Sequence, residues 1–263
     1  MSRIRLAALS SLLLPVSLAH AETTDETGEE PIAARAPANE DSFTPGLTHS
    51  AAVGRAIATA TATLDGAKHL NTVDLNGEVQ VFGPVRLVLR VDNMLAGGNG
   101  KARPGIGAAV QLLDERKHGV AGSAYVSYKA EGFTEAEGEI ESLVSFGKQF
   151  GPVHSTLNLA YGQDPEGVER DGELALGLHV EPIHGLFTGV VGRFRDALGS
   201  NGDKGVLLNG GQILRDALGG ASATYVIGNI GLTATAGIAG VTTTTSHTMQ
   251  AGPAAAFTVG TVF

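Results

Sequence analysis

Apolar residues recur at every second position over most of this sequence. Between Thr72 and Val81 each odd position is apolar or glycine and each even position is polar. The alternation resumes after Gly83-Pro84 and returns in residues 153–161 and 174–181. A β-strand places alternate side chains on opposite faces, whereas a helix, with 3.6 residues per turn, would scatter them around its axis. The chain is therefore predicted to be all-β.

Short turns and longer loops alternate between these segments. Phe82-Gly83-Pro84-Val85 recurs as Phe150-Gly151-Pro152-Val153, and Val180-Glu181-Pro182-Ile183 is a third version. Proline suits such turns because its φ is fixed and its missing N–H is not needed there. The charged segment 114–118 is predicted to be a further turn at the same end. The remaining connections are longer and polar: residues 93–104, 131–138, 163–172 and 196–204. This arrangement is typical of an antiparallel up-and-down barrel of the outer membrane.

The length of the repetitive region sets the strand number. A membrane-spanning strand needs about 9 to 11 residues, so residues 52–263 are long enough for about twelve strands, with ten as the alternative. Residues 206–220 are the hardest to assign and are compatible with a strand and turn or with a short helix ended by glycine. Residues 217–250 carry no charged side chain. Their frequent Gly, Thr and Ser favour strands over a transmembrane helix.

The N-terminus has the features of an export signal. Arg3 and Arg5 precede an apolar stretch, and Ala19-His20-Ala21 matches a small-x-small cleavage site. Residues 1–21 are therefore predicted to be a cleaved signal peptide. Residues 22–51 are acidic and contain three prolines, and they offer too little apolar surface to offset the entropy of ordering. We expect them to form a flexible leader, either a solvated tail or an arm that binds a partner.

The last strand carries a family resemblance. Ala255, Phe257 and Val259 alternate toward a terminal Phe263. This pattern resembles the C-terminal signature of Gram-negative outer-membrane β-barrel proteins, although Thr261 stands where that signature prefers an apolar residue. The resemblance implies export to the outer membrane of a Gram-negative bacterium, contact with outer-membrane lipid, and insertion by the barrel-assembly machinery through the strand that ends at Phe263.

Aromatic residues are few for such a barrel, in which they normally form belts at both interfaces. The chain has 9 Phe, 4 Tyr and no Trp. Phe82, Phe150 and Phe263 are expected near the short turns, whereas Tyr128, Tyr161 and Phe194 are expected near the loops. A secreted soluble barrel that binds a ligand inside, with its apolar faces inward, is therefore an alternative fold.

The sequence contains no strong catalytic motif. The Gly-x-Ser-x-Gly elbow, the His-Glu-x-x-His motif and the calcium-loop pattern are all missing from it, and the absence of cysteine excludes thiolate chemistry. The net charge of −9 argues against nucleic-acid binding. No cofactor is predicted, and the only metal candidate is the weak set of His179, Glu181 and His184, for which a hydrogen-bonded polar wall is the plainer interpretation.

If the apolar faces contact lipid, the polar faces enclose a lumen. Arg86, His154 and His184 each follow a turn proline by two positions and are expected in a basic ring at the periplasmic mouth. The predicted lumen-lining residues are charged or carry an imidazole: Asp74, Glu78, Arg86, Arg90, Asp92, Glu139, Glu141, His154, Glu173, His179, Arg193 and Arg195. Such charges either pair and plug the lumen or line a wet channel and bias which ions pass.

These observations lead to one leading hypothesis and three alternatives. The leading hypothesis is a small passive channel for ions or small solutes. A plugged structural or adhesive barrel, which would bind a partner through its loops or leader, is the second. A membrane-embedded hydrolase is a minority interpretation, and the soluble ligand-binding barrel completes the set.

Overall fold

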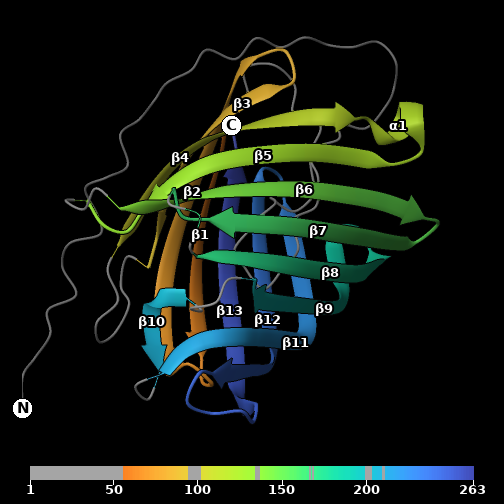
Figure 1. The fold of residues 1–263 in the computed structure, drawn as a ribbon. Helices are drawn as coiled ribbons and strands as arrows, with labels where there is room; N and C mark the ends of the chain where they lie inside the picture. Colours follow the sequence, from red (N-terminus) through yellow and green to blue (C-terminus); the bar gives the residue numbers. More distant parts are fainter. Residues whose placement is uncertain are drawn as a thin grey trace, which may run out of the picture. The chain divides into compact units, whose positions relative to one another are not determined.

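The protein is described by a computed structural model, which covers residues 56–93, 102–133, 137–165, 167, 169–198, 203–208 and 211–263. These residues form antiparallel strands and one short helix, α1 (Glu115–His118) (Figure 1). The strands are β1 (Ala56–Asp65), β2 (Leu70–Phe82), β3 (Val85–Asp92), β4 (Arg103–Leu113), β5 (Ala121–Ala130), β6 (Gly138–Phe150), β7 (Val153–Gln163), β8 (Arg170–Ile183), β9 (Leu186–Ala197), β10 (Asp203–Leu208), β11 (Gly211–Ile227), β12 (Ile230–Thr243) and β13 (Gln250–Val262).

The sheet closes into a barrel. From β1 to β9 each strand pairs with the next, β9 pairs with β11, and β11 leads through β12 and β13 back to β1. Backbone hydrogen bonds between Ala56 and Phe263 seal the join between the first and last strands. The short strand β10 pairs with the first residues of β11, beyond the segment that pairs with β9. The prediction of an all-β antiparallel barrel with twelve wall strands is confirmed.

The C-terminal part of the chain is built of strands. Residues 211–220 belong to β11, so the alternative of a short helix at 206–220 is wrong. The uncharged segment 217–250 supplies part of β11, the whole of β12 and the first residue of β13. Among the described residues, no helix is long and apolar enough to cross a membrane. The predicted signal peptide and acidic leader lie outside the described residues.

Most of the short turns lie at one end of the barrel, which we call the turn end; the opposite end, which also carries the four-residue turn between β1 and β2, is the loop end. Gly83 and Gly151 open two of these turns with positive φ values of 48° and 57°, a conformation that glycine adopts without a steric penalty. Helix α1 connects β4 and β5 at the same end, beside the turn between β6 and β7 (Figure 1).

The third predicted turn, at Glu181-Pro182, is displaced by three residues. Pro182 belongs to β8, and the chain reverses at His184-Gly185, where Gly185 has a φ of 78°. The register between β8 and β9 shifts between Val180 and Ile183, so the ladder is irregular where the proline lacks an N–H. The Glu181 carboxylate accepts a hydrogen bond of 2.8 Å from the N–H of Gly185 and stabilises the observed turn.

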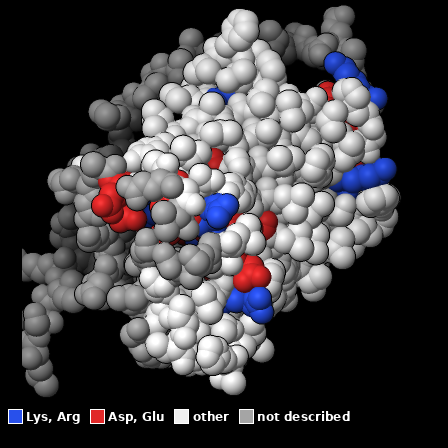
Figure 2. Space-filling model, in the orientation of Figure 1, with Lys and Arg blue, Asp and Glu red and all other residues white. Residues whose placement is uncertain are grey.

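The two faces of the wall differ in polarity. Large apolar side chains cover the outer face. Leu89, Leu176 and Val190, for example, are 52%, 50% and 57% exposed. Figure 2 shows a broad stretch of the wall without charged residues between the charged residues at the centre and left of the view and those at its right edge. Phe82 and Phe150 end their strands at the turn end, and Tyr161 lies on the outer face toward the loop end. The apolar side is outside, which is opposite to the arrangement of the soluble alternative.

Candidate functional site

The interior face of the wall carries all twelve residues that the sequence singled out. Each stands on the same face of the sheet as the buried residues of its own and the neighbouring strands, and each is itself buried or half-buried. Glu78, Arg90 and His179 are the most enclosed, at 3%, 6% and 3% exposure. The interior face is not uniform along the barrel. Its loop half is charged and its turn half is mainly neutral.

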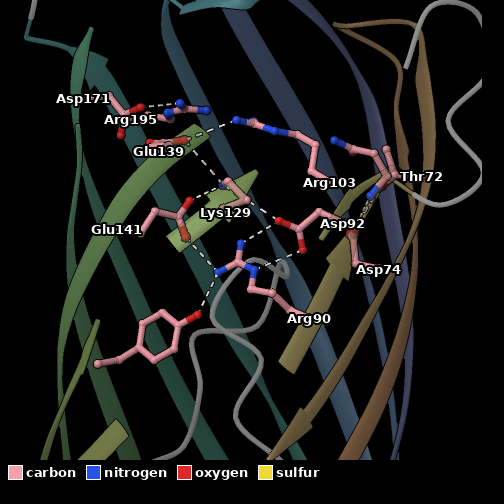
Figure 3. A network of polar contacts seen from close by, with 12 residues as sticks. Thr72, Asp74, Arg90, Asp92, Arg103, Lys129, Glu139, Glu141, Asp171 and Arg195 are labelled. Carbon is pink, nitrogen blue, oxygen red and sulfur yellow. Dashed lines mark hydrogen bonds and ion pairs between the residues drawn. The ribbon is translucent and has the colours of Figure 1, made fainter. Parts of the chain in front are cut away.

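Arg90 of β3 is at the centre of the charged half (Figure 3). Its guanidinium donates to Asp92 at 2.7 Å, to Glu141 of β6 at 2.8 Å and to the hydroxyl of Tyr125 at 3.4 Å. The side chain reaches β6 because it lies over Gly105 of β4, where a Cβ would come within 2.8 Å of the Arg90 Cγ atom. Glycine at this position therefore lets one arginine join three strands.

Lys129 of β5 extends the network toward the loop end. Its ammonium pairs closely with Glu141 and lies 3.7 Å from Glu139 and 3.8 Å from Asp92. Arg103 of β4 approaches the same oxygen of Glu139, Oε2, at 3.6 Å. These contacts join cations and carboxylates of β3, β4, β5 and β6 into one connected group, as Figure 3 shows. Hydrogen bonds between ionised groups are stronger than neutral ones.

A second charged group lies on β8, β9 and β11. Arg195 pairs with Asp171, and Arg193 donates to Asp216 at 2.8 Å and lies 3.8 Å from Glu173. Asp216 is only 2% exposed and also accepts a hydrogen bond from the ammonium of Lys68. Asp74 of β2 accepts a 2.7 Å hydrogen bond from the N–H of Asn93 and so holds the end of β3.

The turn half contains one charged pair and two imidazoles. Arg86 and Glu78 lie 2.6 Å apart and satisfy each other. His154 packs edge-on against Phe187 with ring centroids 5.2 Å apart, and His179 Nε2 lies 3.2 Å from the Ser222 hydroxyl. Part of this half and of the middle is lined by small neutral polar side chains, all buried: Thr59, Thr61, Ser145, Thr156, Asn158, Ser222, Thr224, Thr233, Thr235 and Thr258. Beside them, an apolar cluster of Val88, Ala109, Tyr125 and Leu143 fills the interior against β3 to β6.

The structure does not bring the proposed metal ligands together. His179 contacts Ser222 inside the barrel, whereas His184 is in the turn with a side chain 90% exposed and meets only the Glu181 carboxylate among these groups, at 3.6 Å. Within the part of the chain that the structure describes, no group of three His, Asp or Glu residues is placed to hold a metal ion. His184 also lies outside the expected basic ring, because the turn falls at His184-Gly185 and not at Pro182.

Sequence reasoning missed several members of the network. Lys129 continues the alternation of β5, and Asp171 continues that of β8, so extending both patterns by one more period would have included them. Asp216 fell in the segment whose secondary structure was ambiguous. Lys68 and Arg103 lie in or beside loops, where the period of two gives no signal.

Each end of the barrel has an open hollow. The hollow at the loop end is bordered by Arg103, Glu139, Asp171 and Arg195, among others. The one at the turn end reaches Arg86. Between them most interior side chains are buried, and ion pairs join strands across the loop half.

Comparisons with known proteins agree with this fold. No protein-family model and no curated protein matches the sequence. An outer membrane channel from Pseudomonas putida F1 is similar in structure, with a TM-score of 0.59 and 12% identity over 84% of this chain and 100% of that chain. A NanC porin structure gives 0.49 and 7% over 78% and 98%, and LpxR from Salmonella typhimurium gives 0.48 and 8% over 79% and 100%. The first likeness establishes that this chain has the fold of a Gram-negative outer-membrane β-barrel.

Proposed function

We propose that this protein spans the outer membrane of a Gram-negative bacterium and acts as a narrow passive channel for ions or small solutes. The route runs through the barrel interior and crosses the charged loop half and the neutral turn half. No step of this function requires catalysis. The predicted lumen-lining residues then have two roles, since they hold the wall together and set which solutes pass.

The outer face supports the membrane location. Eleven of the twelve wall strands have 10 to 17 residues, long enough to cross the apolar layer of a bilayer, and β3 has 8. Apolar side chains such as Leu89, Leu176 and Val190 are turned outward, where they would be costly in water over so wide an area. The C-terminal strand β13 completes the wall by pairing with β1. This position suits the insertion signal that its resemblance to outer-membrane proteins implies.

The single observation that carries the channel proposal is the polar interior. Charged side chains line the loop half on most of the wall, and hydroxyls and imidazoles continue the polar lining to the turn end on the side of the wall opposite the apolar cluster of Val88, Ala109, Tyr125 and Leu143. A barrel that served only as a membrane anchor could fill this space with apolar side chains, which avoid the cost of removing charges from water. Keeping the charges is consistent with passage of polar solutes.

A second candidate function has its own support. The charges of the loop half compensate one another, and Arg90 and Asp92 are only 6% and 8% exposed. Such a network is also what a plugged structural or adhesive barrel needs to hold its interior shut. In that case the loops or the acidic leader would supply the partner contacts.

Bilayer conductance separates the two functions. The full chain, isolated from the outer-membrane fraction and shown to be folded by its heat-dependent migration, is inserted into a planar bilayer in potassium chloride. A channel gives reproducible unitary currents that change when Arg90→Gln removes the central cation. A plugged barrel gives no current above that of the empty bilayer, although the protein is folded and inserted, and this result would overturn the channel proposal.

A further inference from the structure

The hollow at the loop end is bordered by four charged side chains that keep accessible surface. They are Arg103 of β4, Glu139 of β6, Asp171 of β8 and Arg195 of β9, and we call them the charge quartet. Their side chains are 22%, 15%, 21% and 29% exposed, respectively. Arg103 points toward Glu139, and Arg195 points toward Asp171 (Figure 3). The quartet therefore faces a space that a solute can enter from the loop end.

Arg103 and Glu139 attract each other without forming a hydrogen bond. Glu139 Oε2 lies 3.6 Å from Arg103 Nη2 and 3.7 Å from Lys129 Nζ, and both distances exceed those of N–H···O hydrogen bonds. Lys129 pairs closely with Glu141 instead. Within the described residues, the Arg103 guanidinium and the Glu139 carboxylate thus keep hydrogen-bonding capacity that a solute in the hollow can use.

The two carboxylates of the quartet meet over Gly162 of β7. A Cβ atom at this glycine would collide with the Glu139 carboxylate and would lie 3.1 Å from Asp171 Oδ1. Two carboxylates so close together repel each other, and a cationic group that bonds to both relieves the repulsion. An ammonium group offers three N–H donors and can therefore contact two acceptors at once. The carboxylate side of the hollow thus favours an ammonium group.

The arginines of the quartet select among solutes that carry an ammonium. A simple cation would meet the two arginines as well as the two carboxylates. A solute with a carboxylate beside its ammonium avoids this conflict, because a guanidinium binds a carboxylate through paired N–H donors. Arg103 is placed for this role, 3.6 Å from Glu139. The hollow has a volume of about 40 Å³, room for about three or four water molecules at roughly 10 to 15 Å³ each, which suits a small head group.

We propose that the charge quartet binds the head group of α-amino acids, in which an ammonium and a carboxylate share one carbon atom. The ammonium bonds to Glu139 and Asp171, and the carboxylate bonds to Arg103. Arg195 holds Asp171 in place through their ion pair. The side chain of the amino acid stays in the open mouth of the hollow, so the site accepts side chains of different size. This inference rests on the proposed channel function and deepens it, because it gives the channel a substrate class.

The test uses the full chain in detergent micelles and saturation-transfer NMR at neutral pH, with three probes of similar size: L-alanine, L-lactate and L-alaninol. Lactate replaces the ammonium of alanine by a hydroxyl, and alaninol replaces the carboxylate by a hydroxymethyl group. We expect the signal of alanine to be several-fold larger than that of either other probe, because only alanine engages both the carboxylates and Arg103. Equal signals for the three probes would overturn the inference.

Two variants examine the two halves of the site separately. Glu139→Gln should remove the preference for alanine over lactate, because the ammonium loses a charged acceptor. Arg103→Gln should remove the preference for alanine over alaninol, because the carboxylate loses its guanidinium. Glu181→Gln and Lys117→Gln, which also remove a carboxylate and a cation but at the turn end, are the matched controls and should keep both preferences. Preferences that survive Glu139→Gln and Arg103→Gln would contradict the inference.

A conservative variant protects the test against misfolding. Each variant is first checked for heat-dependent migration. Glu139→Asp keeps the carboxylate and should retain part of the preference for alanine over lactate; its complete loss in this folded variant would contradict the contact with the ammonium. Binding is measured without conduction, so alanine binding without current would contradict only the channel, and current without a preference for alanine would contradict only the site.

Discussion

Lys68, in the turn between β1 and β2, places its ammonium 2.8 Å from the carboxylate of Asp216 on β11, 148 positions later in the chain. Arg193 donates to the second oxygen of the same carboxylate at 2.8 Å. Beside Lys68, Ala67 is 5% exposed and packs in an apolar cluster that includes Leu218 and Val241. The turn is therefore folded into the loop half of the barrel and held there by an ion pair and by packing.

Removing the ammonium of Lys68 is expected to loosen this turn. Lys68→Met keeps most of the apolar stem but leaves Asp216 with one fewer cation, and the lost charged hydrogen bond should lower the free energy of unfolding by about 1.5 to 3 kcal/mol. The mean current should rise because the turn is held less firmly across the lumen. Lys117→Met on the exposed helix α1 is the control and should leave both quantities unchanged. If the Lys68→Met protein had wild-type current and stability, the ion pair between Lys68 and Asp216 would not be what fastens this turn across the lumen.

The contact between Arg90 and Glu141 should be strongly coupled. Each single substitution, Arg90→Gln or Glu141→Gln, removes one charged hydrogen bond and is expected to cost about 1.5 to 3 kcal/mol, because Glu141 keeps Lys129 and Arg90 keeps Asp92 as a partner. The double variant should cost clearly less than the sum of the two singles, because neither charge remains. Urea unfolding of the protein in lipid vesicles gives all four free energies. Additive costs would mean that the 2.8 Å contact contributes no interaction energy.

Replacing Arg86 and Arg90 together by Gln should shift the channel toward cations. Arg86 faces Glu78, and Arg90 faces Asp92 and Glu141, so the double change leaves carboxylates uncompensated along the route. The reversal potential in a potassium chloride gradient should move toward that of potassium. Arg215→Gln, a change at an exposed arginine paired with Asp196, serves as the control. An unchanged reversal potential in the double variant would remove both arginines from the conduction path.

The fold could be predicted from the sequence because its signals are local. A strand with one face in lipid must alternate, so Thr72 to Val81 reveals both the strand and its two faces. The repeated Gly-Pro turns at 83–84 and 151–152 mark one end of the barrel. They can be recognised in the sequence because glycine adopts the positive φ of these turns without a steric penalty. Pro182 misled the same reasoning because proline also fits the irregular end of a strand, while Gly185 forms the turn.

The contacts of the candidate site depend on closure of the barrel and are not local. Arg90 meets Glu141 across two intervening strands, and only because Gly105 leaves room beneath its side chain. Lys68 meets Asp216 because β11 and β1 are brought near each other by β12 and β13. The alternation shows that these residues point inward, but it does not state which of them meet. The stagger of the strands decides that, and it emerges only when the sheet closes.

The outer face provides the last prediction, which concerns the bilayer itself. Leu176, in the middle of β8, and Ile183, at its turn end, are 50% and 62% exposed, so a lysine fits at either position without repacking. If lipid covers this face, Leu176→Lys should lower the free energy of unfolding in vesicles by about 2 to 4 kcal/mol, and Ile183→Lys by about 0 to 1 kcal/mol, because only the first buries its charge near the bilayer midplane. Small and equal effects at both sites would mean that water, and not hydrocarbon, surrounds β8.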